Sequence, residues 1–455
     1  MARRLRLLWV TPYLPQRGVS AAREHWWSLL ACLAPRHDIT LLAFVDDEDE
    51  APVRQLPASL SALRLVPRRP WRPDDPFALL PRTVAGHYAD PAFGDAIAEQ
   101  LGAGRYDLVQ YECIEMANLV PRASLPSVLA VPQVGFAQEG PRWRAEGRPL
   151  RRAGVLLHRY LRELDFGLRA VRRVHHVITV SPQDADRLQR FEPRLRVSVS
   201  PLGVDGAFFV PRDPDPLLAT DLLFVGNFSH PPNVDAARFL ITAVLPLIGG
   251  RPSTRIVGHG AERVAGTPAG GGVTVTGPVP DLRPHLAAAR VVVAPVRFGT
   301  GMRGKVLEGL AMGRPVVTTS LGAEGLDAEP GTHILVADDA AGCASAIRRV
   351  LDDPAFGARL GSAGRRLVES RFGWSDIAAH HEGLWERIVA DPGEPLEWTE
   401  GPAIAPGLSA LARAGRWPAI GTGTGILLAR ALRWHLRARR NVRAMGPGRT
   451  PAGVA

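Results

Sequence analysis

The segment from Val291 to Gly325 constrains the fold of this chain more than any other part of the sequence. It reads VVVAPVRFGTGMRGKVLEGLAMGRPVVTTSLGAEG, which predicts a buried strand, a glycine-rich turn, a helix and a second buried strand. The glycines let backbone N–H groups of the turn approach a ligand closely. The helix start adds unpaired N–H donors and a partial positive charge. The segment therefore predicts a site for a phosphate or diphosphate.

Charged side chains at the start of the predicted helix indicate which anion binds. Arg303 and Lys305 place two full positive charges beside the turn. Glu308 follows one helical turn later, where its carboxylate can accept hydrogen bonds from both hydroxyls of a ribose while the basic pair holds phosphates. The implied ligand is a nucleotide. The alternative interpretation treats these three residues as ordinary surface charge.

The length of 455 residues exceeds one ordinary core and predicts two domains. A hydrophobic fraction of 46% excludes wholesale disorder. Cys32, Cys113 and Cys343 are far apart and odd in number, which indicates neither a disulfide framework nor a CxxC metal site. The apolar run at the N-terminus is too short for a signal peptide, and no window holds the roughly eighteen apolar residues of a membrane span. We therefore expect a cytoplasmic protein.

The net charge of +10 favours an anionic partner, which is a nucleic acid, an anionic membrane surface or a sugar nucleotide. The sequence has no zinc-finger spacing, no RNP-like strand and no arginines interleaved with stacking aromatics, so nucleic-acid binding is excluded. His25, His230 and His259 lack the spacing of metal ligands, so no metal is expected.

Apolar strand patterns alternate with helical patterns in both halves of the chain, which is typical of parallel sheets covered on both faces. The alternation restarts near residue 221. We predict an α/β fold with two doubly wound Rossmann-like domains and a ligand cleft between them. Gly18 follows the first predicted strand, at a strand-to-helix turn of the kind that faces ligands in such folds, and we take it as a donor-binding candidate.

The motif GTGMRGKVLE resembles the donor-site signature of retaining GT-B glycosyltransferases of family 4, the glycosyl transferases group 1. That signature has two glutamates separated by seven residues. Glu308 stands at the second position and Thr300 at the first. One branch of the family carries a glycine-rich turn followed by an Arg and a Lys, and this sequence fits that branch.

The resemblance implies the roles of the donor-site residues. Arg303, Lys305 and the backbone amides of Gly301 and Met302 would stabilise the leaving diphosphate, Glu308 would bind the ribose, and Thr300 would lie near the transferred sugar. Family donor domains also have glycine turns after their first three strands. Here these turns contain Gly226, Asn227, Gly258 and Gly277, and Gly226-Asn227 stands where many relatives have Gly-Arg and a later Lys.

The first domain departs further from the family. Relatives carry a His after the fifth strand that reaches the transferred sugar, whereas this sequence has Gln133 there. Gln133 can hydrogen-bond a sugar but cannot transfer a proton. Glu112 follows a predicted strand and Arg23 lies early in the first helix, and both are expected to face the cleft. We take Arg23 and Gln133 as acceptor-side candidates and Glu112 as a catalytic candidate on that side.

The resemblance also places the domain boundaries. The segment PLGVD at 201–205 resembles the family's turn between domains, so the predicted domains span 1–203 and 204–373. A helix at about 374–390 resembles the terminal helices that pack back on the first domain. Residues 391–455 form a basic tail rich in Pro, Gly and Arg, with an amphipathic helix at about 425–440 whose arginines form one stripe. Such a helix is typical of an anionic membrane interface, and the alternative is a helix docked on its own protein.

The function that the resemblance implies is a retaining glycosyltransferase that needs neither metal nor cofactor. Its donor would be a nucleoside diphosphate sugar, and its acceptor a lipid-linked or polysaccharide glycan of cell-envelope or exopolysaccharide synthesis. It would act in the cytoplasm, at the inner face of the plasma membrane. Two alternatives remain: a sugar-nucleotide epimerase of the same architecture, and a GT-B scaffold with a decayed site.

Overall fold

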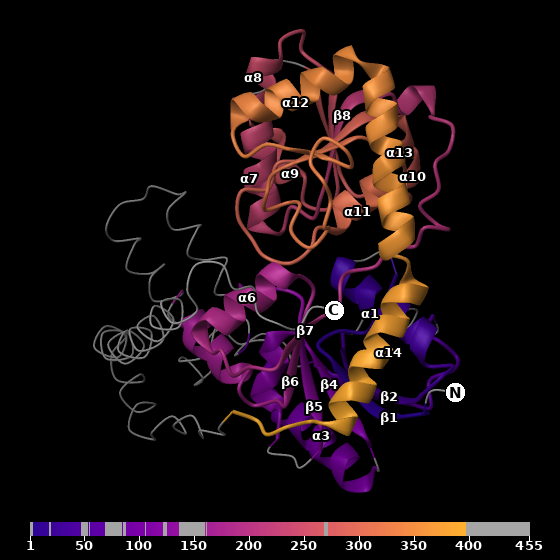
Figure 1. The fold of residues 1–455 in the computed structure, drawn as a ribbon, viewed down its shortest axis with the longest axis vertical. Helices are drawn as coiled ribbons and strands as arrows, with labels where there is room; N and C mark the ends of the chain where they lie inside the picture. The colour runs from indigo at the N-terminus through magenta and orange to yellow at the C-terminus, as the bar shows by residue number, and fades with distance from the viewer. Residues whose placement is uncertain are drawn as a thin grey trace, which may run out of the picture. The chain divides into compact units, whose positions relative to one another are not determined.

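The computed structural model describes two compact units, Met1–Ser200 with His380–Ala455 and Pro201–Ala379 (Figure 1). Within them, the described residues are 3–17, 20–46, 53, 55–68, 84, 88–104, 106–121, 125–135, 160, 162–267 and 272–396. Gly18, most of the predicted tail and its helix at 425–440 lie outside these residues.

The first unit is built on a seven-stranded parallel sheet with the order β3-β2-β1-β4-β5-β6-β7. The inner strands are buried, which explains why they read as continuous apolar runs in the sequence. The strands are β1 (Arg6–Thr11), β2 (Asp38–Val45), β3 (Ala62–Pro67), β4 (Leu108–Glu112), β5 (Ser127–Val131), β6 (His176–Thr179) and β7 (Val197–Val199).

Helices cover both faces of this sheet. Side-chain caps start several of them: Ser20 accepts a hydrogen bond from the Arg23 N–H at the start of α1, and Ser181 accepts one from the Asp184 N–H at the start of α6. The helices are α1 (Ala21–Leu33), α3 (Pro91–Ala103), η2 (Ile114–Leu119), α6 (Pro182–Phe191) and the residues from His380 onward of α14 (Trp374–Ala390).

Helix α14 is docked on the first sheet by buried polar contacts. Trp385 is fully buried, and its Nε1–H donates to Gln110 Oε1 over 2.6 Å. His381 Nε2 lies 3.1 Å from the same oxygen, and His381 Nδ1 lies 2.9 Å from Ser200 Oγ. Because burial lowers the pKa of His381 to about 3, this ring is neutral, with Nε2 donating and Nδ1 accepting.

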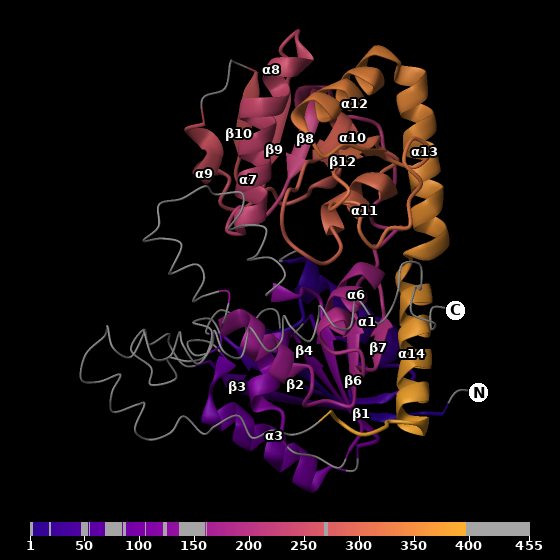
Figure 2. The same cartoon turned by 60° about the vertical axis from the view of Figure 1, so that its left-hand side comes forward.

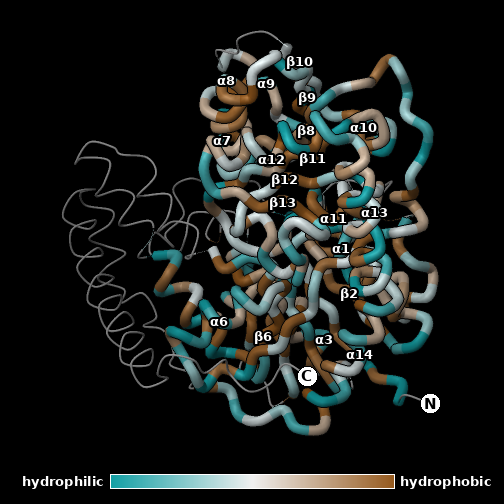
Figure 3. Tube along the Cα trace, turned by 45° about the horizontal axis from the view of Figure 1, so that its top comes forward, coloured by the Kyte–Doolittle hydropathy of each residue, from teal (hydrophilic) through white to brown (hydrophobic). Residues whose placement is uncertain are grey.

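The second unit is built on a six-stranded parallel sheet with the order β10-β9-β8-β11-β12-β13. Figure 3 shows its central strands in the hydrophobic colours. The strands are β8 (Thr220–Val225), β9 (Thr254–Val257), β10 (Val273–Thr276), β11 (Ala289–Ala294), β12 (Val316–Thr318) and β13 (Leu335–Val336).

The helices of the second unit also lie on both faces of the sheet. The group α7, α8 and α12 lies on one face, and α11 packs with α13 on the other (Figure 2). The helices are η3 (Pro216–Leu218), α7 (Pro231–Phe239), the π-turn η4 (Leu240–Val244), α8 (Leu245–Ile248), α9 (Glu262–Ala265), α10 (Arg283–Ala288), α11 (Gly304–Ala311), α12 (Ala340–Asp352) and α13 (Pro354–Arg371). The predicted α/β fold with two Rossmann-like domains is confirmed.

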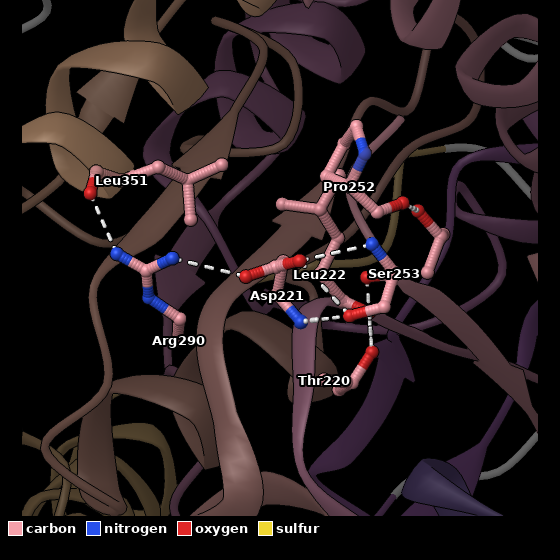
Figure 4. A network of polar contacts seen from close by, with 8 residues as sticks. Thr220, Asp221, Leu222, Pro252, Ser253, Arg290 and Leu351 are labelled. Atoms are coloured by element: carbon pink, nitrogen blue, oxygen red, sulfur yellow. Dashed lines mark hydrogen bonds and ion pairs between the residues drawn. The ribbon is translucent and has the colours of Figure 1, made fainter. Parts of the chain in front are cut away.

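A polar network ties the amino ends of the strands in the second sheet (Figure 4). Asp221, at the start of β8, accepts hydrogen bonds from the Ser253 N–H and hydroxyl, each over 2.9 Å. Arg290, on β11, donates to Asp221 over 3.0 Å and to the carbonyl of Leu351, at the end of α12, over 2.6 Å. Side chains therefore pin this edge of the sheet together.

Among the described residues, no helix combines the length and the apolar character that a membrane span requires.

Candidate functional site

Four strands of the second sheet end in the turns that the sequence analysis singled out. We call residues 226–230, 258–260, 277 and 299–303 the turn cluster; they follow β8, β9, β10 and β11. These strands are parallel neighbours, so their carboxyl ends meet at one edge of the sheet, where α/β proteins bind ligands. The structure thus places the candidates Gly226, Asn227, Gly258, Gly277, Thr300, Gly301 and Met302 at one edge of the sheet, and Glu308 follows on α11.

Hydrogen bonds run through the cluster from one turn to the next. The Gly258 N–H donates to the carbonyls of Thr276 and Gly277 over 3.2 and 3.3 Å. The Gly226 N–H donates to the Val257 carbonyl over 3.0 Å, and the Phe228 N–H donates to the His259 carbonyl over 2.7 Å. The cluster is therefore preorganised by its own backbone.

The turn after β11 needs its glycines. Gly299 has a φ of 120° and Gly301 a φ of 80°, which are conformations that residues with a side chain rarely adopt. A Cβ on Gly299 would lie 3.0 Å from Arg303 Nη2. Arg303 folds back so that its Nη1 donates to the Thr300 carbonyl over 2.7 Å, and it occupies the N-cap of α11. A guanidinium is thus held at a helix start, which favours an anion.

Thr300 and Met302 lie inside the turn. Thr300 is 1% exposed, and its carbonyl orients Arg303. The Met302 side chain is buried, and its sulfur accepts a hydrogen bond from the Leu202 N–H over 3.3 Å, which anchors the turn to the segment at 201–204. We infer that a ligand meets the backbone of these two residues more readily than their side chains.

Lys305 lies in the first turn of α11 and is partly buried. Its Nζ donates to Asn233 Oδ1, on α7, and lies 5.2 Å from the centre of the Phe224 ring. Burial and, to a smaller extent, the Arg303 charge lower the pKa of Lys305 to about 7, and the Glu308 carboxylate opposes both effects. Glu308 is thus close enough to Lys305 for their charges to interact.

Sequence reasoning missed Asn233. Its Nδ2 donates to the Asn227 carbonyl over 2.7 Å while its Oδ1 accepts from Lys305, so one amide joins the turn after β8 to the start of α11. Two features of the sequence could have indicated it. Asn233 lies near a predicted helix start after a glycine turn, and its partner Lys305 is the only lysine in the sequence.

Two threonines at the end of β12, Thr318 in the strand and Thr319 just after it, were also missed. Thr318 Oγ1 donates to the Ala294 carbonyl over 2.7 Å, and Thr319 Oγ1 donates to the Val296 carbonyl over 2.6 Å. The Gly322 N–H donates back to Thr319 Oγ1 over 3.0 Å. These bonds fix the loop after β12 against the start of the β11 turn. The signal was the Thr-Thr pair that ends a buried strand.

The structure corrects the placement of Glu112 in the first unit. It is expected to face a cleft, but the residue is 1% exposed, and its Oε1 accepts from Trp9 Nε1 over 2.9 Å and from Gln110 Nε2 over 2.6 Å. Residues two apart in a strand share a face, so Glu112 points with Gln110 toward the face that holds α14. Burial raises the pKa of Glu112 to about 7, although its hydrogen bonds oppose this shift.

Glu112→Gln tests this structural interpretation. A carboxyl whose pKa is raised from 4.5 to about 7 on folding loses its stabilising contribution as the pH rises from 4.5 through 7. Gln stays neutral, so E112Q lacks this pH dependence. The free energy of unfolding of E112Q relative to that of the wild type should therefore increase from pH 5 to pH 8. Denaturant unfolding at both pH values measures this, with exposed Glu99→Gln as the control. A difference that does not change with pH would contradict it.

The other first-unit candidates lie near the carboxyl edge of the first sheet. Arg23 Nε donates to the Leu14 carbonyl over 2.7 Å, in the segment between β1 and α1, and its guanidinium lies 5.9 Å from the Tyr13 ring centre. Gln133 is exposed and lies just after β5. Gly18 is outside the described residues. Arg23 and Gln133 thus stay predictions for the acceptor side.

The fold and the turn cluster define a class of protein. Two Rossmann-like units on parallel sheets, with a basic glycine turn at the carboxyl edge of the second, form the fold of GT-B glycosyltransferases. Residues 219–353 match the family model described as Glycosyl transferases group 1. The match begins just before β8 and contains the whole turn cluster, so it lies within the second unit.

Individual relatives agree with this assignment. A 75-residue stretch is 39% identical to glycogen synthase of Mycobacterium tuberculosis (strain CDC 1551 / Oshkosh) and covers 16% of this chain and 18% of that protein. The chain therefore matches less than a fifth of that curated relative's length.

Solved structures resemble the chain over most of its length. Sucrose-phosphate synthase (tll1590) from Thermosynechococcus elongatus superposes with a TM-score of 0.63 at 19% identity, covering 85% of this chain and 99% of that one. Anabaena Alr3699/HepE in complex with UDP and glucose gives 0.59 at 14% identity, covering 84% and 100%. At these identities the likeness shows the fold. Fold and family match together support a glycosyltransferase.

Proposed function

We propose that this chain is a retaining, metal-independent glycosyltransferase that moves a sugar from a nucleoside diphosphate sugar to a hydroxyl of a lipid-linked or polysaccharide acceptor. One observation carries the proposal: Arg303 lies in the turn cluster and Lys305 just after it, and the charges of Arg303 and Glu308 both act on Lys305, within the segment that matches the family model. Two cations and a carboxylate at a helix start suit a diphosphate joined to a ribose.

The chemistry needs few side chains. The bond between the sugar's anomeric carbon and the diphosphate oxygen breaks, and a bond to the acceptor oxygen forms on the same face. The acceptor's proton passes to the departing phosphate oxygen, so no protein carboxylate has to carry it. Arg303 and Lys305 would stabilise the charge that grows on the diphosphate, which is an electrostatic contribution. Glu308 would hold the ribose hydroxyls.

The comparisons guide the choice of donor. The Anabaena neighbour has been crystallised with UDP-glucose, so UDP-sugars are the first donors to test. The family match favours a transferase over an epimerase of the same architecture. A lipid-linked acceptor, a role in cell-envelope synthesis and a peripheral site on the inner membrane face are parts of the proposal that rest on the basic composition.

Glu308→Ala tests the proposal. UDP-, GDP-, ADP- and TDP-sugars are added without metal, and one of them should raise the melting temperature of the wild type, because a ligand specific for the native state stabilises it. Loss of a charged hydrogen-bond partner should weaken that donor by about tenfold to a hundredfold in E308A. Glu369→Ala, on α13 and paired with Arg365, is the matched control and should bind like the wild type.

Two outcomes would contradict the proposal. If no sugar nucleotide of the panel raised the melting temperature of the wild type or was hydrolysed by it, the transferase hypothesis would be wrong. The alternative of a scaffold with a decayed site would then be favoured. Equal binding by E308A and the wild type would remove Glu308 from the ribose site.

A further inference from the structure

Lys305 is the only lysine among the 55 lysine and arginine residues of this chain. All the other basic residues in this count are arginines, including Arg303 in the neighbouring turn cluster. A guanidinium keeps its proton at every physiological pH, whereas an amine releases it readily when buried. The chain thus places its single lysine beside a permanently charged arginine, where a diphosphate is proposed to bind.

Asn233 binds this amine through an amide, and neither Asp nor Leu, which have a similar shape, offers the same donor and acceptor. An ammonium only donates hydrogen bonds and a carbonyl only accepts them, so the Asn233 amide has one orientation, with Oδ1 toward Lys305 and Nδ2 toward the Asn227 carbonyl. Asp at this position would lack the donor, and Leu would lack both groups. Gly226 makes room for the amide, since a Cβ there would lie 3.1 Å from Asn233 Cγ.

Three neighbouring residues interact electrostatically with Lys305. They are Arg303 in the turn, Glu308 on α11 and His230 at the N-cap of α7. The uncharged Phe224 ring lies beneath it from β8. Burial next to Arg303 disfavours a second positive charge, and an arriving diphosphate would reverse that balance.

We propose that Lys305 takes up a proton from solvent when the donor diphosphate binds, and that Asn233 is the positioning residue that sets the pH range of this uptake. The inference rests on the proposed function and deepens it. Asn233 stabilises the charged amine through its acceptor oxygen and directs it toward the turn after β8. Donor capture thereby becomes sensitive to pH near neutrality.

The direction of the pH effect follows from linkage. The pKa of about 7 for Lys305 in the free protein means that the amine is already charged below pH 7 and neutral above it. Above pH 7 each binding event has to add the proton, so affinity for the diphosphate falls by up to about tenfold per pH unit. Below pH 7 this contribution to affinity is constant.

The single lysine allows a direct measurement on the full chain. Reductive methylation with ¹³C-formaldehyde labels one ε-amine besides the N-terminal amine, and NMR follows its titration. In Asn233→Ala the pKa of Lys305 should fall, because the acceptor is lost, and in Asn233→Asp it should rise. Asp235→Asn is the matched control on the same helix, since Asp235 pairs with Arg297 instead, and it should leave the titration in place. Identical titrations in the wild type and both Asn233 variants would overturn the role of Asn233.

Calorimetry tests the coupling itself. UDP, GDP, ADP and TDP are titrated between pH 7 and pH 8.5 in buffers of different ionisation enthalpy. The wild type should take up close to one proton at pH 8, and its dissociation constant should rise with pH. Lys305→Arg should show neither effect, and Asn233→Ala should move the loss of affinity to lower pH.

The outcomes separate the two proposals. Binding by the wild type without proton uptake, or equal uptake by K305R, overturns this inference and leaves the proposed function intact. Failure of all four nucleoside diphosphates to bind the wild type at any pH overturns the proposed function, and the inference falls with it.

Discussion

Replacing Arg303 with alanine is expected to lower kcat/KM for sugar transfer by about a hundredfold to a thousandfold, the usual cost of removing one preorganised donor from a developing oxyanion. The guanidinium is anchored on the Thr300 carbonyl and stays charged at every working pH. The charge on the leaving diphosphate grows toward the transition state, so kcat should fall more than nucleotide affinity. Steady-state kinetics and nucleotide titration of the same variant measure the two effects.

Arg290→Ala is the matched control, because Arg290 belongs to β11 and lies before the turn that carries Arg303. It pairs with Asp221 and caps the Leu351 carbonyl at the amino edge of the sheet, as Figure 4 shows, and its side chain is 47% exposed. We expect R290A to lose at most about 1 kcal/mol of stability and to keep its kcat/KM. An R303A enzyme that turns over as R290A does would show that the diphosphate is held elsewhere.

The turn cluster was predictable from sequence because its signals are local. Buried apolar strands, the glycines that end them and the basic residues of 299–305 lie next to one another in the chain, and parallel strands deliver their carboxyl ends to one edge. The order of the strands changes nothing in that argument. The fold class followed from the same alternation of strand and helix patterns.

Contacts between distant residues were not predictable in the same way. Asn233 and Lys305 are 72 positions apart, and their hydrogen bond depends on how α7 and α11 are rotated about their axes. Glu112 ends a strand, as the sequence suggests, but its side chain bonds to Trp9 of β1 and to Gln110, which in turn bonds to Trp385 of α14 across 275 positions. A pattern of apolar residues identifies a strand end without showing which face carries a particular carboxylate.

Gly258→Ala is expected to be the most destabilising glycine-to-alanine substitution in the turn cluster. Gly258 has a φ of 141°, which residues with a side chain rarely adopt, and a Cβ there would lie 1.9 Å from the Gly226 carbonyl oxygen. The two turns cannot separate freely, because the Gly226 N–H is bonded to the Val257 carbonyl. We expect a loss of about 3 kcal/mol and a melting temperature lower by about 6 to 12 °C.

Gly266→Ala provides the comparison for this variant. Gly266 ends α9 with a φ of −85°, and a Cβ there would meet no atom within 4 Å, so the same added methyl should change stability by less than about 0.5 kcal/mol. Calorimetric melting of both variants and the wild type makes the test. Equal melting of G258A and G266A would mean that the turns after β8 and β9 approach each other less closely than described. A large loss confined to G258A would be accompanied by weaker nucleotide binding, because pushing the Gly226 carbonyl aside displaces the adjoining Asn227 and, through its carbonyl, the amide that orients Lys305.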